Sequence, residues 1–178
     1  GPKMRDALLV VIGFLTGGLL IGGLWFVTPA WAFSSKDLAK LEATNECPKC
    51  DLDLANLRKG DLRNAKLDMA FMIGAKMRGV NLSGASLEGA VLRGANLNVA
   101  NLSGANLRKA NLSAAFLLSA DLRNADLRDA NFNDANLNGA DLRGATLTKT
   151  TFNKTLLRGA NLTGLDLSTA LMDKAKLT

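Results

Sequence analysis

The sequence contains no histidine and no tyrosine, and only three prolines and two cysteines among 178 residues. Histidine is the commonest general base and the commonest neutral metal ligand, so acid–base catalysis would fall to carboxylates or lysines. Two cysteines alone cannot supply a four-ligand zinc site. These absences argue against an ordinary metabolic enzyme and predict neither a catalytic residue, a cofactor nor a bound metal.

No charge of one sign dominates the chain. The net charge of +6 comes from 22 basic and 16 acidic side chains that alternate along the sequence. Such mixing is typical of a solvated surface and not of the basic stripe that holds nucleic acid. We therefore expect no nucleic-acid partner.

Residues 1–32 resemble a targeting segment and not part of a folded domain. A remnant typical of a purification tag and a short basic stretch precede an apolar run over residues 7–27. Ala30-Trp31-Ala32 then matches a small-x-small export signal, which predicts cleavage before Phe33. The alternative is a retained membrane anchor, because 21 apolar residues can span a bilayer. Either function would place the rest of the chain outside the cytoplasm.

A short helix is predicted next. Ser34-Ser35-Lys36-Asp37 matches a capping box, with Ser34 as the N-cap and Asp37 as its third helical residue. The apolar spacing predicts about ten helical residues ending near Asn45. A helix of this length is marginal alone in water, so it must dock on another part of the chain.

From Cys50 to the end, the chain repeats every five residues without an insertion. The central residue of each block, from Leu52 to Leu177, is Leu, Met or Phe in all 26 blocks. The residue two before it is Ala in 20 of the 26, so we call it the small position. The residue between them, the polar position, is most often Asn or Asp.

A period of five fits neither an α-helix nor a flat strand. Five residues advance about 500° around a helix, and an odd period alternates between the two faces of a sheet. The central residues share one interior only if each block turns the chain by a fixed angle. Four turns of about 90° close a square coil of 20 residues, which predicts an all-β solenoid of stacked coils. Phe132 and Phe152 would then be vertical neighbours inside it.

The pattern A-(N/D)-L-x-x, as in Ala95-Asn96-Leu97 and Ala140-Asp141-Leu142, resembles the pentapeptide repeat family. The resemblance implies a right-handed quadrilateral β-helix over residues 50–178, about 6.5 coils long. Residues 33–49 would form an N-terminal helical cap. It also implies similarity to exported cyanobacterial and chloroplast members, which places the chain in the periplasm or the thylakoid lumen.

Cys47-Pro48-Lys49-Cys50 admits three interpretations. A thiol-redox motif needs a βαβ setting, which the surrounding sequence does not provide. A metal site lacks two ligands. A structural disulfide between Cys47 and Cys50 suits an exported protein and would tie the helix to the first coil.

Several apolar residues occupy positions predicted to face outward, where the repeat normally has polar residues. They define a candidate partner surface formed by Met69, Phe71, Ile73, Val91, Phe116 and Leu118. The alternative is that the helix at 34–45 or the leader covers the first group. At the other end, the last coil carries candidates for end-to-end homodimer formation, namely Leu156, Leu165, Leu171 and Met172.

The favoured function is a non-catalytic, exported structural or protein-interaction module. A DNA-mimicking topoisomerase-binding protein is an alternative, because some family members act in this way. The positive charge and the export signal argue against it. A thiol-redox protein acting through Cys47 and Cys50 is a further alternative, with no other residue to support it.

Overall fold

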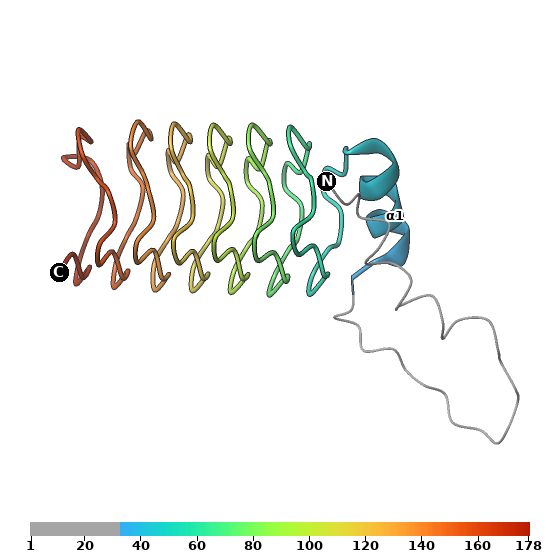
Figure 1. Ribbon diagram of the computed structural model, residues 1–178, viewed down its shortest axis with the longest axis horizontal. Helices are drawn as coiled ribbons and strands as arrows, with labels where there is room; N and C mark the ends of the chain where they lie inside the picture. Colours follow the sequence, from blue (N-terminus) through green and yellow to red (C-terminus); the bar gives the residue numbers. More distant parts are fainter. Residues whose placement is uncertain (1–32) are drawn as a thin grey trace, which may run out of the picture.

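The computed structural model describes residues 33–178, which form one short helix followed by a long solenoid (Figure 1). The predicted leader, residues 1–32, lies outside the described residues. Helix α1 spans Ser35–Thr44. Its N-cap is Ser34, whose side chain accepts a hydrogen bond from the Asp37 amide at 3.2 Å, and the left-handed Asn45 ends it. The capping box therefore locates this helix correctly.

The solenoid contains no long strands among the described residues. Its coils are joined by single-residue parallel β-bridges, each between positions 20 apart, from Glu46–Lys66 to Leu156–Lys176. Residues 20 apart therefore share a column, and four five-residue blocks make one coil. The four blocks form the four sides of the coil, which we number from the side that contains Asp51. The 20-residue square coil predicted from the repeat is confirmed.

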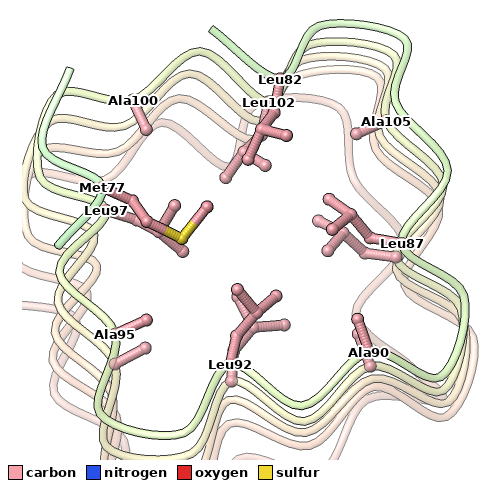
Figure 2. Close-up of a cluster of buried hydrophobic side chains, with 14 of the residues drawn as sticks. Met77, Leu82, Leu87, Ala90, Leu92, Ala95, Leu97, Ala100, Leu102 and Ala105 are labelled. Carbon is pink, nitrogen blue, oxygen red and sulfur yellow. The ribbon is translucent and has the colours of Figure 1, made fainter. Parts of the chain in front are cut away.

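The interior is filled by the central and small positions of every block. Figure 2 shows central residues such as Leu87 and Leu92 pointing toward the axis from the four sides, with Ala90 and Ala95 between them. From coil to coil these side chains stack, and those from Leu52 to Leu142 are all at most 1% exposed at the central position. Close packing of this kind admits residues about the size of leucine at the central position and about the size of alanine at the small position, which explains the strict repeat.

Each block ends in a tight turn. The amide of the next small position donates to the central carbonyl, as from Ala55 to Leu52 at 3.1 Å. The residue two after the central one, which we call the corner position, has a left-handed backbone in nearly every block. Glycine holds ten of these corners because it adopts positive φ without strain.

The buried aromatic pair follows from the column geometry. The rings of Phe132 and Phe152, one coil apart, are stacked with centroids 5.4 Å apart and an interplanar angle of 14°. Their predicted vertical contact is confirmed. Two threonines take nearby small positions, and both hydroxyls donate to backbone carbonyls at 2.7 Å, Thr150 to Leu127 and Thr155 to Phe132.

The bridge ladder begins earlier than the predicted boundary at residue 50. Glu46 already pairs with Lys66, and Cys47 fills a fully buried central position. The block before Cys50 is therefore built as a repeat although its central residue is not Leu, Met or Phe. A cysteine is small and apolar enough to substitute there.

Helix α1 and the residues around it contact the exposed edge of the first coil (Figure 1). The Ser34 amide donates to the Asp51 carbonyl at 3.0 Å, and the Asp51 amide donates to the Asp37 carboxylate at 2.8 Å. Asn45 bonds two neighbouring sides, through its carbonyl to the Lys66 amide and through its side-chain amide to the Arg63 carbonyl. Leu41 is buried against the core. No helix within residues 33–178 is long and apolar enough to cross a membrane.

Candidate interaction surface

The outer surface is built largely by side chains that bond their own backbone. At the polar position, the Asn or Asp oxygen accepts from the amide of the residue after the central one. Asn101 accepts from Ser103 at 2.9 Å, and Asn131 accepts from Asn133 at 2.8 Å. This short-range bond resembles an Asx turn and explains why the repeat prefers Asn and Asp there.

Where an apolar residue takes the polar position, a side chain from the preceding coil can replace the missing acceptor. The Phe71 side chain cannot accept a hydrogen bond, and the Ile73 amide donates instead to the Asp53 carboxylate one coil below at 2.7 Å. Phe116 is compensated in the same way, because the Leu118 amide donates to Asn98 at 2.9 Å. The amides of Arg158 and Asp173, which follow Leu156 and Leu171, are bonded in the same way, and so is the Asn153 amide, although its block has threonine at the polar position. The surface thus accommodates outward apolar residues without unpaired amides at these positions.

Several acidic side chains are neutralised within their own block. Arg123 donates two hydrogen bonds to the Asp121 carboxylate, from Nε at 2.9 Å and from Nη2 at 2.7 Å. Arg143 bonds Asp141 in the same way one coil above. The hydrogen bond from Arg143 lowers the pKa of Asp141 to about 2. These ion pairs are exposed, so each contributes little stability. They leave this face without the uninterrupted negative charge that a DNA mimic requires.

The first apolar cluster lies on side one and at its corner with side four, where Met69 lies, close to α1. Met69, Phe71 and Ile73 are 49%, 46% and 40% exposed. Val91, which pairs with Phe71 across a β-bridge, is half-buried. Helix α1 leaves the cluster uncovered, so the prediction that residues 34–45 might cover it is wrong. The helix lies across the end of the coil, where it bonds the Asp51 edge.

The structure adds Leu54 to this first cluster. Leu54 is 45% exposed at a left-handed corner, φ 61°, next to Gly74 in the coil above. Leu54 was not predicted, because the repeat pattern alone does not distinguish corner residues from the other outward positions. The sequence feature that could have revealed it is an apolar residue in a column that continues with two glycines, Gly74 and Gly94.

A second apolar cluster lies on side two, further along the solenoid. Phe116 and Leu118 are 49% and 42% exposed, and Val99 joins them at 46%. The Val99 amide donates to the Leu118 carbonyl at 2.8 Å. Val99 has φ 52°, a conformation that a β-branched residue rarely adopts. Strained residues of this kind are often retained for function, and sequence analysis missed this one too.

The last coil is less well covered than the others. Leu165 and Met172 pack partly buried against the core, Leu156 is also half-buried, and Leu171 is 58% exposed. The bridge expected between positions 146 and 166 is missing from the ladder of the described residues. These four residues therefore lie at one end of the solenoid, but on different sides of it.

Cys47 and Cys50 are joined by a disulfide in the structure, with Cα atoms 5.4 Å apart. Both are buried, at 0% and 4% exposed. A thiol-exchange protein needs an accessible sulfur atom, so this burial argues against the redox interpretation. No group of three or more metal-ligating side chains occurs within residues 33–178.

Together, the 20-residue coil, its single-residue bridges and its leucine-filled interior define a β-solenoid of four-sided coils. The sequence matches the family model for pentapeptide repeats in eight copies, over residues 55–94, 75–113, 105–144 and 140–178. The chain belongs to the pentapeptide repeat family, whose fold is the right-handed quadrilateral β-helix. Proteins of this family are generally structural or interaction modules.

Three solved structures illustrate the similarity. A trypsin-treated variant of QnrB1, a plasmid-mediated fluoroquinolone resistance protein, is 25% identical, with 69% of this chain and 64% of that one covered and a TM-score of 0.47. The chain thus spans slightly less than two thirds of that protein. HetL, involved in heterocyst differentiation regulation in the cyanobacterium Nostoc, is 30% identical over 74% and 82%, TM-score 0.33. A member from the Arabidopsis thaliana thylakoid lumen is 26% identical over 64% and 70%, TM-score 0.23. No curated protein sequence matches.

Proposed function

We propose that the chain is an exported, non-catalytic interaction module that binds a protein partner through its exposed apolar clusters. The observation that carries this proposal is their placement. Among residues 33–178, seven of the nine exposed large hydrophobic residues lie from Leu54 to Leu118, and none lies between Leu118 and Leu171. Exposed apolar groups on an otherwise polar surface mark interaction sites.

Helix α1 serves as a cap in this proposal. An uncovered coil presents unpaired amides and carbonyls that could pair with another chain. Ser34, Asp37 and Asn45 bond such groups on three sides of the first coil. The cap would keep the N-terminal end from aggregating and would leave the sides of the solenoid as the surface for binding.

One feature of the sequence and one of the structure support export. Residues 7–27 and Ala30-Trp31-Ala32 together fit an export signal. The disulfide between Cys47 and Cys50 suits an oxidising compartment. We propose the thylakoid lumen or the periplasm.

Affinity capture from gently solubilised membranes and the soluble extract of that compartment tests the interaction. The tagged chain is compared with two variants, Phe71→Asn with Ile73→Ser and Val91→Asn, and Phe116→Asn with Leu118→Ser. The replacements follow the residues that other coils carry, so the coil should persist. A stoichiometric partner that is lost in either variant would support the proposal and locate its surface. A partner retained by both variants would refute binding through these clusters.

A second candidate, an end-to-end homodimer, is favoured by the incompletely buried last coil. Leu171 and Leu177 are exposed, while Leu165 and Met172 are only partly covered. A two-fold axis at this end would bury these residues against their copies. Analytical ultracentrifugation at tens of micromolar tests it, and a monomeric mass would contradict it.

A further inference from the structure

The first apolar cluster lies close to Ser34, near the start of the described residues, whereas the second lies further along the solenoid. We propose that the four exposed residues of the first cluster, Leu54, Met69, Phe71 and Ile73, contact the surface of a lipid bilayer. This inference goes beyond the proposed protein interaction, which the second cluster can serve alone. It rests on the proposed export and on the second interpretation of residues 1–32, in which the chain is not cleaved before Phe33 and residues 7–27 stay attached as a membrane anchor.

The chain enters the fold on the same side as the first cluster. The Ser34 amide donates to the Asp51 carbonyl, so the residue that follows Phe33 is fixed at the edge of side one. Asp51 in turn pairs by a β-bridge with Phe71. Phe71 is therefore only two bridge spacings, about 10 Å, from Ser34.

The link to residues 7–27 is short. Only residues 28–32 separate that apolar run from Phe33, and six residue steps span at most about 20 Å. The run has no charged residue and is 21 residues long, which suffices to cross a bilayer. Anchored in this way, side one of the first coils would be held close to the membrane surface. Trp25 and Trp31 flank the junction, and tryptophan favours that interfacial region.

The residues of the cluster suit this environment. All four are large and apolar, and each is at least 40% exposed. Leu54 and Met69 lie at left-handed corners, φ 61° and 55°, where ten other blocks have glycine. Leu54 and Met69 therefore place large apolar side chains at corners where glycine has no side chain. Apolar groups of this kind insert at the boundary between headgroups and acyl chains.

The test compares the emission of a fluorescent label placed on two opposite sides of one coil in the full chain. Ile73→Cys carries an environment-sensitive label on side one, and Ser83→Cys carries it at the equivalent position on side three. Both native cysteines are buried in their disulfide and should not react. The chain is reconstituted into vesicles of phosphatidylcholine alone, or with anionic phosphatidylglycerol, and each set is repeated with brominated acyl chains.

We expect a blue shift and loss of emission by bromine quenching at position 73, and no change at position 83. Adding Leu54→Asn and Phe71→Asn to the labelled Ile73→Cys chain should reduce the quenching, because asparagine occupies both kinds of position in other coils. Equal quenching at 73 and 83, or none at 73, would overturn the proposal. Neither result would affect the protein capture that depends on Phe116 and Leu118, so the two proposals fail separately.

Discussion

The replacement of a missing acceptor by the preceding coil can be tested at one amide. In the native chain Phe116 occupies a polar position, and the Leu118 amide donates to Asn98 at 2.9 Å. Asn98→Ala removes this acceptor. Phe116→Asn should restore one within the same block, as in blocks whose polar position is Asn, such as that of Asn131. The two substitutions together should therefore cancel much of the damage that Asn98→Ala causes alone.

The expected magnitude follows from the position of this bond. An intramolecular hydrogen bond contributes about 0.5–1.5 kcal/mol net. The bond lies on the surface, where water can partly replace it, so we expect the lower half of that range. This corresponds to roughly a two- to fivefold loss of protection for the Leu118 amide. With Phe116→Asn present, the loss caused by Asn98→Ala should fall close to zero, since the acceptor then comes from residue 116.

Hydrogen exchange followed by mass spectrometry or NMR measures this effect locally, which avoids assuming that a repeat protein unfolds in one step. The four chains of the cycle are compared at the Leu118 amide and at the Ser113 amide, which Asn111 serves within its own block. Protection of Ser113 should stay constant. If Asn98→Ala costs the same with and without Phe116→Asn, the two acceptors do not substitute for each other, and the reasoning is wrong.

Three other predictions concern the ion pairs, the disulfide and the aromatic stack. Arg143 lowers the pKa of Asp141 from 3.8 to about 2, so this contact stabilises the fold above pH 3.8 and the stabilisation is lost as the pH falls toward 2. Arg143→Gln should therefore raise the pKa of Asp141 in an NMR titration, and an unchanged pKa would exclude Arg143 as the cause. Replacing the disulfide with the residues usual at those positions, Cys47→Leu with Cys50→Ala, should cost about 2 kcal/mol and lower the melting temperature by roughly 4–8 °C in calorimetry; no change would show that packing alone suffices. Phe152→Ala should cost about 3–5 kcal/mol by the cavity it leaves, and Phe152→Leu clearly less; equal losses would mean that filling the column is not what stabilises it.

The coil could be predicted from the sequence because one constraint dominates it. A central residue every five positions has a single solution that keeps all of them inside, and the resulting columns fixed Phe132 above Phe152. Helix α1 was predictable for a similar reason, since the Asp37 amide donates locally to the Ser34 side chain. Contacts between neighbours in the chain, or between residues one coil apart, can therefore be predicted from the sequence.

What could not be predicted depends on choices that the repeat leaves open. Leu54 and Val99 obey the block pattern as well as any corner residue, and only the structure shows that their apolar side chains are exposed, at 45% and 46%. The start of the ladder at Glu46 was hidden because Cys47 does not resemble the leucines that follow. The position of α1 across the end of the coil required the bonds from Asp37 and Ser34 to Asp51, which no periodicity encodes.

These exceptions also indicate where function should be sought. A repeat with a fixed interior can change only its outward residues without loss of the coil, and most blocks use that freedom for Asn, Asp and Arg that bond within the block. Phe71 and Phe116 give up such a bond, and each is compensated from below, by Asp53 and Asn98. The hydrogen bond to the preceding coil lets the fold accommodate an exposed phenylalanine, but it does not explain why phenylalanine is there. We propose that the reason lies in contacts outside the solenoid, with a bilayer for the first cluster and with a protein for the second.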